Sequence, residues 1–194
     1  MADIIKAVSV NVERINSQQV EKLIEMLIEA RRSGKKILVI GAGRSGLVCR
    51  AFAMRLMHLT FHVHVVGETI TPALEKDDLL IAISGSGTTT LVVTAARIAK
   101  KVGARVVAIT SHPRSPLGKC ADHVVTVYGR TKLARKRDYF SRQILGVHEP
   151  LAPLGTIFEI AAAIFLDALI VELMNKLGLT EKDMKARHAT IEPP

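Results

Sequence analysis

Aromatic side chains are scarce in this chain of 194 residues: Phe, Tyr and Trp together make up 4% of it, and Trp is absent. Proteins that bind single-stranded nucleic acid stack bases on exposed aromatic rings. The net charge of +9 would by itself suit a polyanionic partner. Because the rings are missing and much of the positive charge lies in one segment, we expect a soluble protein with one basic loop and no nucleic-acid partner.

Cysteine is almost as rare as tryptophan. Cys49 and Cys120 form no CxxC pair and no spacing typical of a zinc site. We therefore expect buried or incidental thiols and a reducing, cytoplasmic location. Residues 1–10 contain too short an apolar run for a signal peptide, and no apolar run before residue 155 approaches the length of a membrane span. We expect no membrane partner.

Short aliphatic runs alternate with amphipathic segments along most of the chain. Such runs suit strands that are buried on both faces of a parallel sheet. We expect strands at residues 37–40, 62–66, 79–83, 105–110 and 123–128. Two helices divided at Ser17 are predicted over residues 2–33, and residues 111–119 are predicted to be a loop. The predicted fold is a three-layer αβα sandwich with a five-stranded parallel sheet in the flavodoxin-like order 2-1-3-4-5.

No linker divides the chain, so we expect a single domain over residues 1–194. Its expected parts are N-terminal helices (2–33), an α/β core (36–128), a long basic loop (129–153) and C-terminal helices (154–188). The loop is longer than most, and its cluster of basic side chains comprises Arg130, Lys132, Arg135, Lys136 and Arg137. We interpret it as a solvated or subunit-contacting insertion; a localisation signal or nucleic-acid patch is the alternative.

The segment Ser84–Thr90 (SGSGTTT) follows the predicted strand at 79–83 and precedes a predicted helix at 91–101. Its hydroxyls and the free N–H groups of the first helical turn favour an anion. It has no Lys, so it does not match the GxxxxGK[ST] loop that binds nucleotide triphosphates. The segment therefore predicts a site for a phosphate monoester; an ordinary Ser/Thr-capped helix start is the alternative.

A second loop, Gly41–Gly46 (GAGRSG), also joins a strand to a helix and matches the GxGxxG dinucleotide fingerprint, with Glu68 where a ribose-binding acid would be expected. In the predicted strand order both loops face one crevice. Arg44 and Ser45 add anion-binding side chains that a pyrophosphate on backbone amides does not require. The second hydroxyl-rich loop beside them favours a small phosphorylated ligand, and a dinucleotide enzyme is kept as an alternative.

The run Gly155–Leu177 is apolar on almost all sides. Glu159, Asp167 and Glu172 interrupt it, which argues against a membrane span. A helix of this kind in a soluble protein is buried. The sheet can cover only one side of it, so we predict a subunit interface on the other.

These motifs together resemble the sugar isomerase (SIS) domain family, and most closely its 6-phospho-3-hexuloisomerases. The resemblance spans almost the whole chain and is carried by Gly41–Gly46, Ala53–Leu59, Val66–Thr69, Glu75–Leu80, Ser84–Gly87, Gly155–Glu159 and Arg187–His188. It implies a flavodoxin-like SIS fold, a homo-oligomer (a tetramer) with active sites near subunit interfaces, and catalysis without metal or cofactor. The long basic loop departs from the family pattern.

The implied reaction interconverts D-arabino-3-hexulose 6-phosphate and fructose 6-phosphate in the ribulose monophosphate pathway. A base removes a proton next to a carbonyl to give an enediolate, and the proton returns on the neighbouring carbon. The resemblance makes Glu159 the candidate base, although Thr156 and Glu159 also fit a capping box. His188 is the candidate for ring opening or proton transfer. His58 is a second candidate that could reach only another subunit's site.

The resemblance assigns the phosphate to Ser84, Ser86 and Thr89. Ser45 offers a further hydroxyl, and Arg44 is expected to bind the phosphate or the sugar hydroxyls. The loop glycines of the predicted binding site are Gly43, Gly85 and Gly87. His62 and His64 share one face of a predicted strand, a weak hint of a metal site, but strand surface is the expected role. A non-catalytic sugar-phosphate sensor on the same fold is the second alternative.

Overall fold

A computed structural model of the chain describes residues 2–129 and 155–188. Five strands form one fully parallel sheet in the order β2-β1-β3-β4-β5. They are β1 (Ile37–Gly41), β2 (Val63–Val65), β3 (Leu79–Ile83), β4 (Arg105–Thr110) and β5 (His123–Thr126). The predicted α/β fold and strand order are confirmed. The predicted basic loop lies outside the described residues, except for Gly129.

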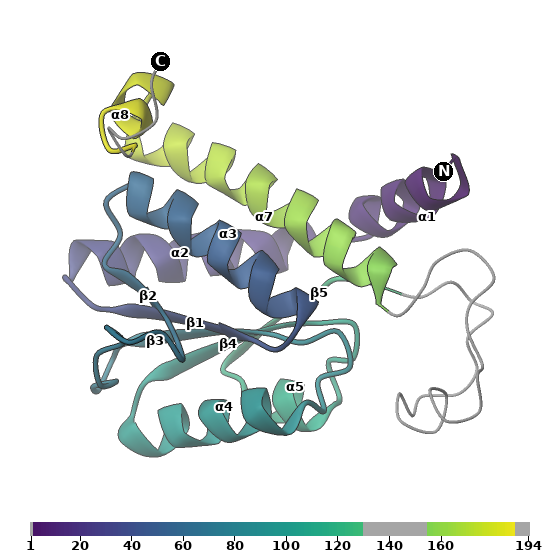
Figure 1. The fold of residues 1–194 in the computed structure, drawn as a ribbon, viewed down its shortest axis with the longest axis horizontal. Coiled ribbons are helices and arrows are strands. Elements are labelled where there is room, and N and C mark those ends of the chain that lie inside the picture. Colours follow the sequence, from purple (N-terminus) through teal and green to yellow (C-terminus); the bar gives the residue numbers. More distant parts are fainter. Residues whose placement is uncertain (1, 130–154, 189–194) are drawn as a thin grey trace.

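Helices cover both faces of the sheet (Figure 1). One face carries α1 (Ala2–Glu13), α2 (Ser17–Arg32), α3 (Arg44–His58) and α7 (Thr156–Leu177), and the other carries α4 (Thr90–Val102) and α5 (Pro116–Cys120). A short last helix, α8 (Glu181–Lys185), follows α7 and contacts α3. Alternate strand residues supply the two cores: Val39 and Ile81 face α3 and α7, whereas Leu38 and Leu80 face α4.

The start of α2 differs by one residue from the prediction. Asn16, not Ser17, is the N-cap, and its side-chain oxygen accepts hydrogen bonds from the N–H groups of Gln18 and Gln19 at 2.9 and 3.1 Å. Both residue types cap helices well, so the local sequence could not distinguish them. Ser17 is the first residue of the helix.

The segment predicted as a loop after β4 contains the one-turn helix α5. Ser115 caps it by accepting a hydrogen bond from the N–H of Gly118 at 3.2 Å, and Pro116 occupies the first helical position. A serine cap followed by proline is a favourable helix start. The two prolines of this segment argued for a loop, but one of them opens the helix.

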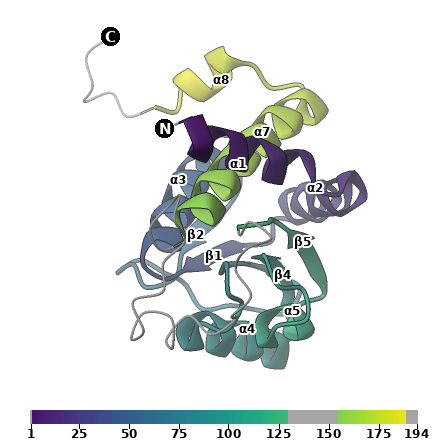
Figure 2. The same cartoon turned by 90° about the vertical axis from the view of Figure 1, so that its right-hand side faces the viewer.

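Helix α7 lies between α1 and α3 and crosses the sheet (Figures 1 and 2). Phe158, Phe165 and Leu169 pack into the core, while Ile164 and Val171 on its outer side are 46% and 54% exposed. Helices α1 and α3 therefore cover much of the surface that the sheet cannot. No helix among residues 2–129 and 155–188 combines the length and hydropathy that a membrane crossing needs.

Candidate active site

The two Gly/Ser loops start side by side at the carboxyl ends of the central strands. The last residue of β1, Gly41, is paired in register with the last residue of β3, Ile83. These strands send their connections to opposite faces of the sheet, because α3 follows β1 on one face and α4 follows β3 on the other. In sheets of this type the crevice at such a point binds ligands. The structure confirms the predicted position of the two loops.

Hydrogen bonds within the loop after β3 tie its hydroxyl groups together. The Ser84 hydroxyl accepts from the N–H of Gly87 at 3.1 Å and lies 3.1 Å from the Thr89 hydroxyl. The Ser86 hydroxyl accepts from the Thr88 N–H at 3.2 Å and from the Thr88 hydroxyl at 3.0 Å. Ser84 is buried, whereas Ser86 and Thr89 are partly exposed, so the latter two can meet a ligand from the crevice.

The alternative interpretation of this loop, a simple helix cap, does not describe it. Thr89 is the N-cap residue of α4, yet its side chain makes no capping hydrogen bond and bonds to Ser84 instead. No side chain at the N-cap therefore occupies the first-turn amides of α4. Unoccupied amides at a helix start attract anions, as the phosphate prediction requires.

Two glycines of the same loop are needed for packing. A Cβ at Gly85 would lie 2.9 Å from Cδ1 of Phe158, and one at Gly87, where φ is +64°, would lie 2.0 Å from the Ser115 hydroxyl oxygen. The Gly85 carbonyl also accepts a hydrogen bond from the Ser111 N–H at 3.1 Å. The start of α7 and the segment after β4 thus pack directly against the Ser84–Thr90 loop, the candidate phosphate site.

The loop after β1 turns sharply into α3. A Cβ at Gly41 would lie 2.7 Å from the backbone of Ser45, and Gly43 has φ of +54° with open space where a side chain would project. Ser45 is buried in the first turn of α3, and Arg44 beside it is exposed. Gly43 therefore needs its backbone conformation, and the space beside it leaves room for a ligand.

Arg44 connects this loop to α7. Its Nε donates to Oε2 of Glu159 at 2.8 Å, across 115 residues of sequence. The Arg44 side chain is 56% exposed and that of Glu159 is 14% exposed. The carboxylate therefore lies largely shielded from water at the crevice, between the loop after β1 and the start of α7.

The capping-box interpretation of Glu159 is wrong. The N-cap of α7 is Gly155, with φ of +76°, and Thr156 is already the first helical residue. Glu159 is one position too far along the helix to complete the box. Its carboxylate instead folds back over Gly155, where a Cβ would lie 3.0 Å from Oε1, and bonds to Arg44. Glu159 is thus positioned by tertiary contacts and not by a helix cap.

The two histidine candidates lie together, but away from Glu159. The rings of His58 and His188 have centroids 5.5 Å apart with planes inclined by 36°. His58 ends α3, which begins at Arg44, so about 20 Å of helix at 1.5 Å per residue separates it from the loop after β1. Figure 1 shows α8 beside this far end of α3. Burial lowers the pKa of His58, and the nearby charges of His188 and Arg55 lower it further.

The acid that a dinucleotide site would use is engaged elsewhere. Glu68 lies 3.6 Å from Nε of Arg50, and both side chains are exposed beside the middle of α3. Its carboxylate therefore has a structural partner. Glu68 follows the GxGxxG motif at the distance that a ribose-binding acid would have, but in the structure it is ion-paired with Arg50 of α3.

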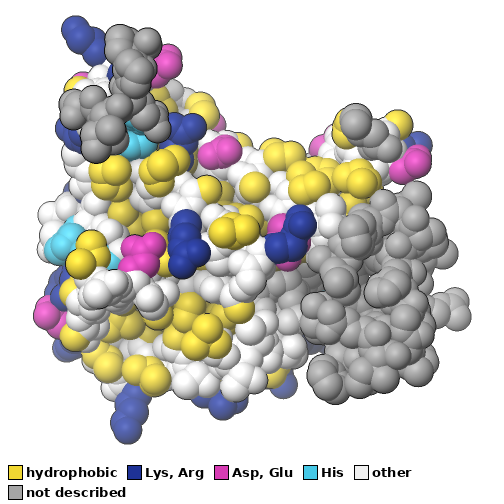
Figure 3. Space-filling view, in the orientation of Figure 1, with side chains coloured by type: hydrophobic (Ala, Val, Ile, Leu, Met, Phe, Trp, Pro, Cys, Tyr) yellow, Lys and Arg dark blue, Asp and Glu magenta, His cyan; other side chains and the backbone are white. Residues whose placement is uncertain are grey.

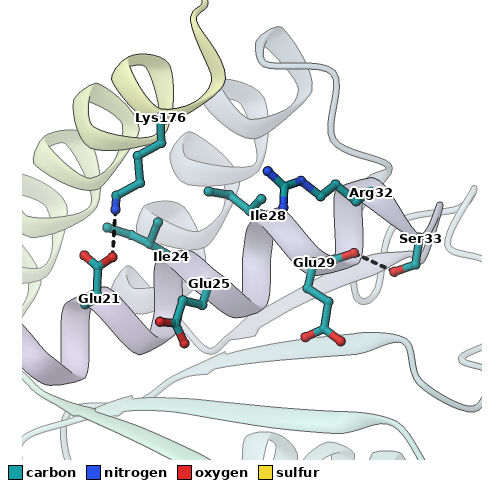
Figure 4. A pocket seen from close by; sticks show the side chains of 8 residues that line it. All are labelled: Glu21, Ile24, Glu25, Ile28, Glu29, Arg32, Ser33 and Lys176. Atoms are coloured by element: carbon teal, nitrogen blue, oxygen red, sulfur yellow. Dashed lines mark hydrogen bonds and ion pairs between the residues drawn. The ribbon is translucent and has the colours of Figure 1, made fainter.

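A groove of about 480 Å³ lies between α2 and the end of α7 (Figure 4). Its acidic lining comprises Glu21, Glu25 and Glu29, and Lys176 is ion-paired with Glu21 at 2.7 Å. The three carboxylates outnumber the two cations of the lining, Arg32 and Lys176, so the groove does not favour a phosphate group. This groove is therefore not the predicted phosphate site.

Comparisons with known proteins agree with this geometry. Residues 32–132 match the SIS domain. An uncharacterised protein from Aeropyrum pernix is 52% identical over 192 residues, which cover 99% of this chain and 91% of that protein. A 3-hexulose-6-phosphate isomerase from Bacillus subtilis is 36% identical over 192 residues, which cover 99% of this chain and 97% of that protein.

A solved structure also matches the chain over almost its whole length. A hypothetical protein from Methanococcus jannaschii, whose crystal structure was taken to infer a function of 3-hexulose-6-phosphate isomerase, matches with a TM-score of 0.77 and 36% identity. The match covers 97% of this chain and 98% of that one. With its parallel five-stranded sheet and its Ser/Thr loop after β3, the chain belongs to the SIS domain family.

Proposed function

We propose that this protein is a sugar-phosphate isomerase that interconverts D-arabino-3-hexulose 6-phosphate and fructose 6-phosphate, a step of the ribulose monophosphate pathway. The names of relatives that cover nearly the whole chain support this substrate pair. The observation that carries the proposal is the Glu159 carboxylate, which bonds to Arg44 of the loop after β1 at 2.8 Å and directly follows Phe158, the residue that lies against Gly85 of the hydroxyl-rich loop. A phosphate anchor and a base are what a ketose isomerase needs.

In this proposal Ser86 and Thr89 bind the phosphate with the amides at the start of α4, and the buried Ser84 hydroxyl, 3.1 Å from that of Thr89, holds the loop in place. Glu159 removes the proton from C2 of the 3-ketose, which gives a 2,3-enediolate, and returns it at C3. The C2 hydroxyl gives up its proton and becomes the carbonyl of fructose 6-phosphate, and the C3 oxygen takes a proton and becomes a hydroxyl, so no oxidant or reductant is consumed. Arg44 orients the carboxylate, and its guanidinium stabilises negative charge that develops on the substrate oxygens.

We further propose that His188, which is exposed, acts in the site of a neighbouring subunit within a homo-oligomer, and that the buried ring of His58 beside it positions it. Their distance from Glu159 in the same chain supports this arrangement. Exposed apolar side chains beside His58, among them Met54 and Met57, also support it. Figure 3 shows hydrophobic side chains gathered on this face of the molecule, over α3 and α7.

The test is fructose 6-phosphate formation from enzymatically prepared 3-hexulose 6-phosphate, compared between the wild-type protein and Glu159→Gln. We expect turnover by the wild type and loss of at least about 100-fold in the variant, because a general base contributes on the order of 10²–10⁴ in rate. Binding of fructose 6-phosphate and the melting temperature should be retained. Binding without turnover by the wild type would instead identify a sugar-phosphate sensor.

A further inference from the structure

Two imidazole rings lie side by side at the open edge of the sheet. The ring centroids of His62 and His64 are 4.9 Å apart, with the ring planes inclined by 63°. His62 precedes edge strand β2 and already shares its hydrogen-bonding pattern, since its carbonyl accepts from the Ile37 N–H at 2.8 Å. Residues two apart on a strand project to the same side of the sheet, so the backbone conformation brings the two side chains together.

This pair is separate from the candidate active site. His64 is in register with Leu38, whose side chain belongs to the core on the α4 face of the sheet. The neighbouring Val63 and Val65 point to the opposite face, toward α3. The two histidines therefore lie at the edge of the α4 face, whereas Glu159 lies at the start of α7 on the other face.

One nitrogen of the pair lacks a partner. Nε2 of His64 is buried and makes no hydrogen bond with any described residue. Burial lowers the pKa of His64, and the adjacent His62 and Lys36 lower it further. The ring is therefore neutral near pH 7 and keeps a lone pair for coordination. His62 is exposed, so an ion from solvent reaches it first, and the His64 ring must turn to bring its buried nitrogen to the same ion.

We propose that His62 and His64 together bind a divalent transition-metal ion. With metal–nitrogen bonds of about 2.0–2.1 Å, and about 1.1 Å from nitrogen to ring centre, two imidazoles on one metal have centroids about 4.4–5.2 Å apart at tetrahedral or adjacent square-planar positions. The observed 4.9 Å lies within this range. The part of the chain that the structure describes holds no cluster of three metal-ligating side chains, so water completes the coordination.

The neighbouring lysine does not prevent this binding. Lys36 is ion-paired with Glu75 at 3.1 Å and with Asp78 at 3.3 Å, and the two carboxylates offset its charge. Imidazole ligands with open water positions favour Cu²⁺ over Ni²⁺, Co²⁺ and Zn²⁺. We therefore expect Cu²⁺ to bind most tightly.

The experiment is calorimetric titration of Cu²⁺ and of Zn²⁺ into the metal-free full-length protein, with Cu²⁺ electron paramagnetic resonance on the same samples. We expect one saturable site with nitrogen hyperfine structure from two imidazoles. Each of His62→Gln and His64→Gln should weaken binding at least tenfold, and the double variant should abolish this site. Cu²⁺ should also raise the melting temperature of the wild type but not that of the double variant.

The matched control is His123→Gln. His123 is the first residue of β5, the other edge strand of the sheet, and its Nε2 lies 2.7 Å from the Gln19 carbonyl oxygen, so it is already engaged. Cu²⁺ affinity should be unchanged in this variant. Equal binding by the wild type and the His62/His64 double variant, or no saturable binding by the wild type, would overturn the proposal.

Discussion

The side chain of Arg44 links the two halves of the candidate site. The sequence predicts that Arg44 binds the phosphate or the sugar hydroxyls. In the structure its Nε donates a hydrogen bond to the carboxylate of Glu159. A guanidinium can orient a carboxylate through fixed donor geometry, which an ammonium does less well. The exposed position of Arg44 also leaves its other nitrogens available to a substrate.

We predict that Arg44→Ala lowers kcat more than it raises KM. Loss of the donor to Oε2 frees the carboxylate to rotate, and misplacement of a catalytic group costs about 100-fold in rate. Arg44→Lys should restore only part of this loss, and added guanidinium should partly rescue Arg44→Ala. These effects are measured by steady-state kinetics. A change confined to KM would show that Arg44 only binds the phosphate.

Local patterns and the family resemblance predict different parts of the candidate site. The hydroxyls of the loop between β3 and α4 indicate an anion site, and the resemblance assigns the phosphate to Ser84, Ser86 and Thr89, which stays a prediction. The Arg44–Glu159 contact could not, because it depends on how α7 packs across the sheet after 115 intervening residues. The contacts of Ser111 and Ser115 with this loop were also missed, although hydroxyls directly after a predicted strand were the available signal.

At the level of elements, the contact between the loop after β3 and the start of α7 fixes the crevice. Phe158 lies against Gly85 and also against Gly129, where a Cβ would be 2.4 Å from the Phe158 Cβ. One aromatic ring at the start of α7 is therefore enclosed by the loops after β3 and β5. This packing positions Glu159, the next residue.

We predict that Gly85→Ala destabilises the protein by about 1–3 kcal/mol, because the new methyl group overlaps the Phe158 ring. Phe158→Leu should recover part of this loss when combined with Gly85→Ala, although alone it is destabilising. The free energy of unfolding of the two single variants and the double variant gives the coupling between the two positions. Additive effects would show that the two side chains do not compete for this space.

A second element-level contact joins the end of α3 to α8 through His58 and His188. The pKa of His58 is lowered below its ordinary value of 6.5 in the folded protein. The unfolded chain therefore binds the proton more readily between these two pKa values, and stability falls as the pH is lowered below about 6.5. His188 and Arg55 face this ring and disfavour its charged form.

We therefore predict that the free energy of unfolding decreases between about pH 7 and pH 5, and that His58→Gln makes this decrease shallower, since a neutral amide does not titrate. Urea unfolding at several pH values measures both slopes. Parallel slopes in the wild type and the variant would contradict the assignment to His58.

Over the whole molecule, the strand order was predictable because the aliphatic runs of β1, β3 and β4 have no polar face and must lie inside a parallel sheet. The bounds of β3 and β4 agree with the prediction. The outer strands β2 and β5 are shorter than predicted: each is paired on one side only, β2 with β1 over Val63–Val65 and β5 with β4 over His123–Thr126. The sequence correctly predicts that α7 is buried. It does not predict that α1 packs against α7.

The apolar outer side of α7 leads to a prediction about assembly. We expect the wild-type protein to be an oligomer in light scattering, and Ile164→Glu or Val171→Glu to yield smaller species with reduced turnover. A charge on an apolar contact surface must be desolvated when subunits meet. The matched control is Ile98→Glu on α4, which is similarly exposed, at 54%, on the opposite face of the sheet. A monomeric wild type would refute this assembly.

The late position of α7 in the chain affects how the protein is made. All five strands are complete by Thr126, but the helix that covers the centre of one face begins only at Thr156. A ribosome that has synthesised the sheet must add roughly thirty more residues, and then the helix itself, which takes a few seconds at typical rates. Until then Val39, Ile81 and Val107 lack the part of their cover that α7 provides. The nascent chain therefore passes through a stage that chaperones would recognise, and the candidate base is added only at its end.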